Sequence, residues 1–194
     1  MTGDFDLYIG GPDPRGVHAI AGEQPAIVLG SGITTPFDAA ARGAVAREVF
    51  ALRRGITAVR TRDDNTIASL VIAACQEAGF SVPNPQYAVF GEVARAVKKE
   101  IPRKVRKAIP DICQRIIASG QDPRQWAAIA RRSIDRLAVI AAGDVSIVLA
   151  DIVGAPRSEL GGLVADNDRA KRLLGFVLSP SYLDLRKKLG MGVK

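Results

Sequence analysis

The stretch TPFDAAARGAVAREVFALRRG, residues 35–55, predicts the helix around which the rest of the fold is organised. Thr35 and Pro36 form a typical helix start, and Gly55 ends the pattern. At about 100° per residue, Glu48 falls in the middle of an otherwise apolar face. That face collects Ala41, Ala44, Val45, Ala51 and Leu52. A buried carboxylate needs a partner, so either a charged or polar group meets Glu48, or this end of the helix is loose enough to leave it partly exposed.

The elements on either side of this helix predict a mainly helical α+β fold. Three short apolar runs come before it, separated by glycine and proline turns, and they predict a small antiparallel sheet from residues 7–9, 17–20 and 26–29. Capping residues and glycine stops predict helices after it, over residues 63–78, 122–143, 144–152, 166–176 and 179–189. We expect a single domain in which the sheet packs on the helices. Its successive parts are a sheet (1–34), a helix pair (35–79), a basic helical segment (86–119) and C-terminal helices (122–194).

Composition limits the class of protein. A chain of 194 residues with 47% apolar and 24% charged residues has the balance of one globular domain. No apolar run approaches the roughly 20 residues of a membrane span, and the first residues lack the basic and apolar pattern of an export signal. Cys75 and Cys113 are too few for a disulfide framework, which favours a reducing cytoplasm. His18 is the only histidine, so zinc sites with two histidines are excluded, and a Ser-His-Asp or Cys-His site has to use it.

The net charge of +7 is concentrated in one segment. Between Glu92 and Lys107 there are only two acids, against seven basic residues: Arg95, Lys98, Lys99, Arg103, Lys104, Arg106 and Lys107. This density predicts an anion-binding stripe for nucleic acid, an acidic protein or lipid headgroups. The alternative is a solvated face on connecting helices that Pro102 and Pro110 interrupt. No aromatic residues alternate with the bases, which weakens a single-strand stacking interpretation.

The sequence Arg47-Glu48-Val49-Phe50-Ala51 stands where an H-E-x-x-H zinc helix would lie, and its surroundings resemble those of M48-type metallopeptidases (the Ste24, HtpX and Oma1 group). The strand, turn and strand before it are similar in residues 7–9, 12–14 and 25–33. Downstream, residues 131–138 resemble that family's E-x-x-x-A-D-R helix, which supplies the third metal ligand and a supporting Asp. The resemblance covers the N-terminal third and the helix around Asp135. It is greatest for domains with a degenerate zinc motif that are attached to bacterial tetratricopeptide-repeat proteins, which implies that this chain is part of a larger protein of that kind.

This resemblance implies that the zinc site has been lost. The three ligand positions correspond to Arg47, Ala51 and Arg131, and none of these residues is a zinc ligand. Only Glu48, in the place of the general base, and Asp135, in the place of the supporting acid, keep their identity. A base without the metal neither lowers the pKa of a bound water nor polarises a carbonyl group. The resemblance therefore implies an inactive enzyme with no catalytic residue, metal or cofactor.

The charges at these positions suggest what replaced the metal. Arginine can hold a carboxylate with two parallel hydrogen bonds, so ion pairs between the two helices can take over the structural role of zinc. We expect Glu48 to pair with Arg131, and Asp135 to pair with Arg47.

Other conspicuous residues have simpler structural interpretations. Gly30-Ser31-Gly32 follows a predicted strand but lacks the spacing of a phosphate loop, so it predicts a turn. His18 and Cys75 are expected to be structural, and Asp63-Asp64 is expected to cap a helix. Trp126 is expected in the core, with an interface contact as the second interpretation.

The sequence thus predicts a catalytically inactive, metallopeptidase-like domain that serves as a protein-interaction or scaffolding module in a bacterial cytoplasm. An extended peptide or partner loop is expected to bind by strand addition near Ala26–Leu29 and the helix carrying Glu48. The alternative is a regulatory domain whose basic segment binds nucleic acid or an acidic partner with salt-sensitive affinity. A third interpretation is a metal-free enzyme that uses Glu48 as a general base.

Overall fold

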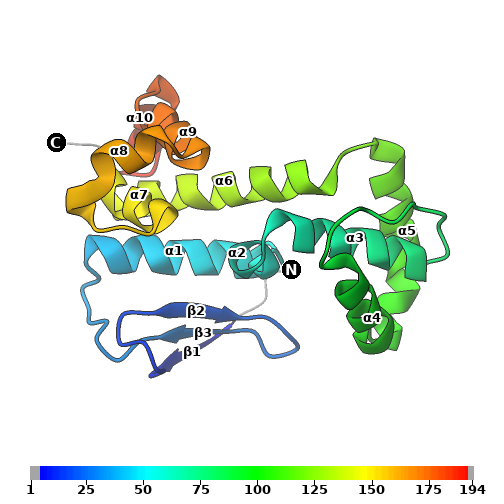
Figure 1. The fold of residues 1–194 in the computed structure, drawn as a ribbon. Coiled ribbons are helices and arrows are strands. Elements are labelled where there is room, and N and C mark those ends of the chain that lie inside the picture. Colours follow the sequence, from blue (N-terminus) through cyan, green and yellow to red (C-terminus); the bar gives the residue numbers. More distant parts are fainter. Residues whose placement is uncertain (1–4, 192–194) are drawn as a thin grey trace. The chain divides into compact units, whose positions relative to one another are not determined.

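The computed structural model describes residues 5–191 as a mainly helical α+β chain (Figure 1). The strands are β1 (Asp6–Ile9), β2 (Val17–Ile20) and β3 (Ala26–Leu29). The helices of the first half are α1 (Ala39–Arg53), α2 (Thr57–Thr61), α3 (Asp64–Glu77), α4 (Phe90–Glu100) and α5 (Arg103–Ser119). Those of the second half are α6 (Pro123–Ala142), α7 (Val145–Val153), α8 (Leu160–Ala165), α9 (Asp168–Val177) and α10 (Pro180–Lys188), with a 3₁₀ turn at Arg157–Glu159. Within the described range, no helix is both long enough and apolar enough to span a membrane.

The described residues group into two compact units, and the single domain expected from the sequence stays a prediction. Unit 1 contains the described residues up to Thr57 together with those from Arg132 onward, and unit 2 contains Ala58–Arg131. The division cuts across the expected segments, because α6 contributes its first half to unit 2 and its second half to unit 1. Each unit has its own apolar core, and each is described separately below.

The three predicted strands are confirmed, but the sheet is mixed and not antiparallel as expected. The strand order is β1-β3-β2, with β1 parallel and β2 antiparallel to β3. The reason lies in the chain path, since β3 turns back from β2 and is inserted between β2 and β1. Gly30 allows this path, because a Cβ at that position would lie 2.3 Å from the carbonyl oxygen of Asp13.

The sheet packs on α1, as the apolar face of that helix predicted. Val17, Ile27 and Leu29 are buried against partly buried side chains of α1. The α1 contributors are Ala44, Val45, Val49 and Leu52. The helix begins later than expected, because Asp38 and not Thr35 is its N-cap, with the Asp38 carboxylate accepting the Ala41 N–H at 2.7 Å.

Helix α1 also lies closely against the second half of α6. A Cβ at Gly43 would be 3.1 Å from the Cβ of Ala142, a spacing that only a very small residue permits. The Arg42 guanidinium donates to the Ala141 and Ala142 carbonyl oxygens at 3.2 and 3.1 Å. These carbonyls belong to the last turn of α6, where no N–H group of the same helix donates to them. The Arg42 side chain supplies the missing hydrogen bonds.

The remaining cores belong to the C-terminal helices and to unit 2. In unit 1, the core joins α6, α7, α9 and α10 through Ala138, Val139, Ile140, Val148, Leu149, Ala170, Leu173 and Tyr182. In unit 2, Ala73 of α3 packs against Phe90, Val93 and Val97 of α4.

The predicted helix starts are confirmed at Asp63 and Asp144, which cap α3 and α7 with their side chains. Pro102 separates α4 from α5 as expected, whereas Pro110 lies inside α5. Because Pro110 removes only one intrahelical hydrogen bond, the rest of this 17-residue helix persists around it. The short helices α2 and α8 were not predicted.

Candidate functional site

Three of the positions that the resemblance assigned to the zinc helix are buried in unit 1. Arg47, Glu48 and Ala51 of α1 are 6%, 7% and 0% exposed. The sequence therefore located the burial of Glu48 correctly, and Glu48 is not without a partner. Arg47 is as deeply buried as Glu48.

Arg47 joins α1 to α7. Its Nη2 donates to Asp151 Oδ2 at 2.6 Å, and the Asp151 side chain is 51% exposed. Among residues 5–191 no group accepts a hydrogen bond from the buried Nε of Arg47. The Nη2 of Arg47 is thus paired whereas its buried Nε is not, so the ion pair links α7 to α1 at some cost in desolvation.

Asp135 joins α6 to α9. It is 1% exposed, and Arg169 holds it with two hydrogen bonds, from Nε to Oδ2 at 2.7 Å and from Nη2 to Oδ1 at 2.8 Å. The expected pairing of Asp135 with Arg47 is therefore wrong. Arg47 and Asp135 both form ion pairs, but with Asp151 and Arg169, which follow in the C-terminal helices that the resemblance did not cover.

Arg131 belongs to unit 2, where it holds α2 against α3. It forms an ion pair with Asp64 and donates to the carbonyl oxygens of Val59 at 3.2 Å and Arg62 at 2.7 Å. The Glu48–Arg131 pair concerns residues of different units and stays a prediction.

The donor chemistry at these positions does not suit zinc. Arg47 and Arg131 carry guanidinium groups, which have no lone pair for a metal, and Ala51 has no donor atom. In the described part of the chain, no group of three or more His, Cys, Asp and Glu side chains is arranged to hold a metal ion.

A small hollow beside the Asp135–Arg169 pair is rich in arginine. Its lining comes from α6 and α9 and consists of Arg132, Asp135, Arg136, Arg169, Arg172 and Leu173. The hollow holds only about 10 Å³, roughly one water molecule. Arg136 lies with its guanidinium 4.9 Å from the ring centre of Phe176, so part of its charge already faces an aromatic ring.

The edge strand β1 presents exposed apolar side chains. β1 is exposed along its whole length, with Leu7 60%, Tyr8 55% and Ile9 75% exposed. β3 is the central strand, so the expected docking edge beside Ala26–Leu29 is already occupied on both sides. The open edges are those of β1 and β2.

Backbone hydrogen bonds show which groups of β1 face outward. The Asp6 N–H donates to Pro25 O at 3.0 Å, and the Gly10 N–H donates to Leu29 O at 2.7 Å. Because N–H groups alternate sides along a strand, those of Leu7 and Ile9 point away from β3. The described residues place no other strand against this edge.

The seven predicted basic residues are all exposed in unit 2. Arg95, Lys98 and Lys99 lie on α4, and Arg103, Lys104, Arg106 and Lys107 lie on the first turns of α5. Two of these side chains donate to backbone carbonyls nearby: Arg95 to Gly91 and Arg106 to Lys98. The segment is thus a charged surface at the α4–α5 junction.

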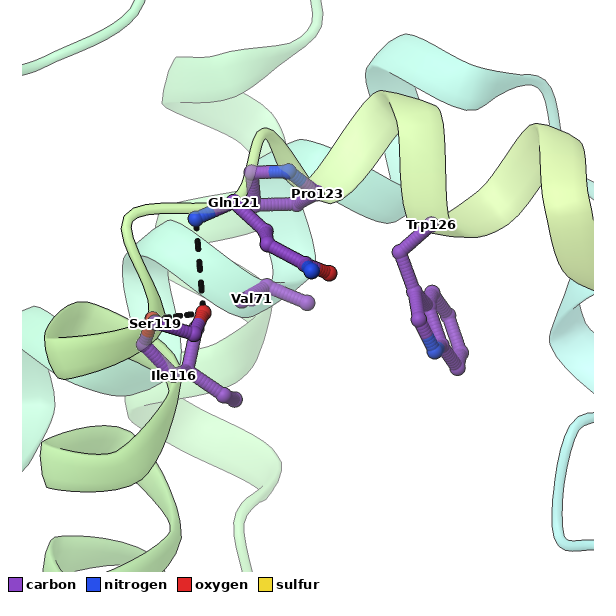
Figure 2. A pocket seen from close by; sticks show the side chains of 6 residues that line it. All are labelled: Val71, Ile116, Ser119, Gln121, Pro123 and Trp126. Atoms are coloured by element: carbon purple, nitrogen blue, oxygen red, sulfur yellow. Dashed lines mark hydrogen bonds between the residues drawn. The ribbon is translucent and has the colours of Figure 1, made fainter.

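Unit 2 also contains an apolar cavity that sequence reasoning missed (Figure 2). Its volume is about 280 Å³, and it is lined by Val71, Ile116, Ser119, Gln121, Pro123 and Trp126. Trp126 is 43% exposed, so the expectation of a core position is wrong. In Figure 2 its indole lies on one side of the cavity, with Ser119 and Ile116 on the other. The sequence feature that could have indicated this cavity is the single tryptophan in the first turn of a predicted helix, just after the polar loop of residues 119–122.

The two cysteines are buried, whereas His18 is exposed and its expected structural role stays a prediction. Cys75 of α3 and Cys113 of α5 are both 2% exposed and free. Burial, reinforced by the neighbouring Cys113 thiol, raises the pKa of the Cys75 thiol to about 12. His18 is exposed on β2, next to Gly16 and Asp13.

Comparisons with protein-family models, with curated proteins and with solved structures found no match to this chain.

Proposed function

We propose that this chain is a catalytically inactive, metallopeptidase-like domain that binds another protein and belongs to a larger bacterial protein. The residues at the three ligand positions support the loss of catalysis, because two are arginines engaged in ion pairs and the third is a buried alanine. Two buried, unbridged thiols favour the cytoplasm as the compartment.

The single observation that carries the binding function is the open edge of β1. Its outward N–H and C=O groups and its exposed Leu7, Tyr8 and Ile9 are what an extended segment needs for strand addition. Main-chain hydrogen bonds would supply affinity, and alternate side chains of the segment would contact Leu7 and Ile9 on one face or Tyr8 on the other. The partner is thus an extended, apolar segment of another protein.

A proline substitution tests this proposal. Random peptides displayed on phage are selected on the full chain, and the affinity of a selected peptide is measured by fluorescence anisotropy. Leu7→Pro removes an outward N–H without touching the hydrogen bonds to β3, whereas Leu7→Thr changes the side chain and keeps that N–H. We expect Leu7→Pro to weaken binding about tenfold more than Leu7→Thr does, as the loss of one backbone hydrogen bond implies. Equal affinity for both variants would refute strand addition at β1.

The exposed basic surface of unit 2 favours a second candidate function, the binding of nucleic acid or another polyanion. Its affinity for duplex DNA should fall steeply with salt, because each neutralised phosphate releases counterions. Binding at the β1 edge should depend on salt only weakly. A titration of each probe at low and high salt separates the two functions.

A further inference from the structure

The cavity beside Trp126 continues into an exposed apolar stripe on α5. Ile116 and Ser119 line the cavity, and Ile112 and Val105 lie on the same face of that helix, one turn and three turns before Ile116. Ile112 and Val105 are each 46% exposed. From Val105 to Ser119 the stripe is about 21 Å long, from a rise of 1.5 Å per residue. That length matches four turns of a partner helix.

The surroundings of the stripe are strongly basic. Helix α5 carries five basic residues and one acid, Asp111. Lys104 and Arg115 lie about 60–100° around the helix from the stripe, and both are exposed. Arg106 lies about 100° from the stripe on its other side and is exposed too, so basic residues stand on both flanks of the stripe.

We propose that the Trp126 cavity and the apolar stripe of α5 bind an acidic amphipathic helix of a partner protein. Apolar side chains at a spacing of three and four residues fit into the cavity and along the stripe, as in other helix-in-groove complexes. The acidic residues on the flanks of that helix face Lys104 and Arg115 on one side and Arg106 on the other. Charge complementarity selects an acidic partner, and the half-exposed Trp126 supplies the aromatic anchor typical of interfaces. This surface lies within unit 2 and is independent of the β1 edge.

The single tryptophan makes the test direct, since Trp126 is the only indole in the chain. The probe is a synthetic helix with Leu at three- and four-residue spacing, Glu at its other positions and no Trp. We expect a saturable blue shift of the Trp126 emission on titration into the full chain. A peptide of the same composition in scrambled order, and a peptide with Lys in place of Glu, should bind at least about tenfold more weakly, because each loses either the apolar face or the charge match.

Variants locate the site. Ile112→Glu places a carboxylate on the stripe at a position exposed enough to keep it hydrated, and it should weaken the acidic peptide about tenfold or more. The matched control is Leu183→Glu on α10 of unit 1, at a residue 54% exposed, which should leave the affinity unchanged. Circular dichroism confirms that both variants are folded.

Three results would overturn the proposal. They are an unchanged Trp126 spectrum with the acidic peptide, equal binding of the scrambled peptide, and equal weakening by both variants. A larger Trp126 response to phosphatidylserine vesicles or to duplex DNA than to the peptide would also overturn it, because the surface would then recognise polyanions and not a helix.

Discussion

The Asp135–Arg169 pair gives the most informative stability prediction. Asp135 is 1% exposed, whereas the Arg169 side chain is 34% exposed. Water can therefore hydrate the Arg169 charge when its partner is removed, but it cannot reach the Asp135 carboxylate. Arg169→Leu leaves a buried carboxylate without its two hydrogen bonds and should cost about 3–5 kcal/mol. Asp135→Leu leaves a guanidinium that can reach water, so it should cost clearly less. The double variant should recover most of the loss, because no charge remains buried.

For a domain of this size, about 3–5 kcal/mol corresponds to a fall in Tm of roughly 6–20 °C. Thermal melting by circular dichroism measures that fall, and amide hydrogen exchange in α9 and the second half of α6 shows whether unit 1 is the part that opens. The control is Arg157→Leu, which breaks an exposed pair with Asp144 and should cost less than about 1 kcal/mol. If Arg169→Leu costs no more than this control, the pair does not hold α6 and α9 together and the reasoning is refuted.

Three other predictions concern packing, a thiol and a helix cap. Gly43→Leu should destabilise the chain by at least about 1–3 kcal/mol in a denaturant melt, since even a Cβ would approach Ala142 to 3.1 Å; an unchanged midpoint would contradict the close contact of α1 with α6. Cys75 should resist alkylation by iodoacetamide at neutral pH until the chain is unfolded, because burial raises the pKa of its thiol to about 12. The free energy of unfolding should be unaffected by this thiol below about pH 9. It should then decrease as the pH rises toward 12, because the thiol ionises in the unfolded chain before it ionises in the folded one. Asp144→Ala should cost about 1 kcal/mol through loss of the α7 cap; hydrogen bonds from Ser146 lower the pKa of Asp144, so the difference in Tm from the wild type should shrink as the pH falls below about 4 and the wild-type carboxylate is protonated.

Local signals in the sequence predicted the elements well, because each is set by neighbouring residues. Asp63 and Asp144 cap helices, the glycine stops end them, and the apolar face of α1 packs on the sheet. The strands were found, but their order was not. Whether a third strand joins the edge of a sheet or enters between two other strands depends on contacts between residues distant in sequence. Here the central position of β3 requires the backbone of Asp13 to lie very close to Gly30.

The partners of the buried charges could not be predicted for a similar reason. The helix pattern placed Glu48 on an apolar face, the family resemblance singled out Asp135, and both residues are buried. The sequence did not show that Asp151 and Arg169 approach from α7 and α9, because any of several exposed acids and arginines satisfies the same charge balance. Trp126 was misplaced because its apolar surface suggested burial, whereas it borders a cavity that is open to solvent.

We propose that Arg47, Ala51 and Arg131 stand at positions that would hold zinc in an active metallopeptidase, and that the chain therefore acts by binding and not by hydrolysis. The most direct test is the zinc content of protein purified without chelator, measured by mass spectrometry before and after incubation with excess zinc and dialysis. The account predicts no stoichiometric zinc in either sample, and no cleavage of fluorescent casein by the wild type beyond that of Glu48→Gln. One zinc ion retained per chain, with casein cleavage that Glu48→Gln abolishes, would contradict it.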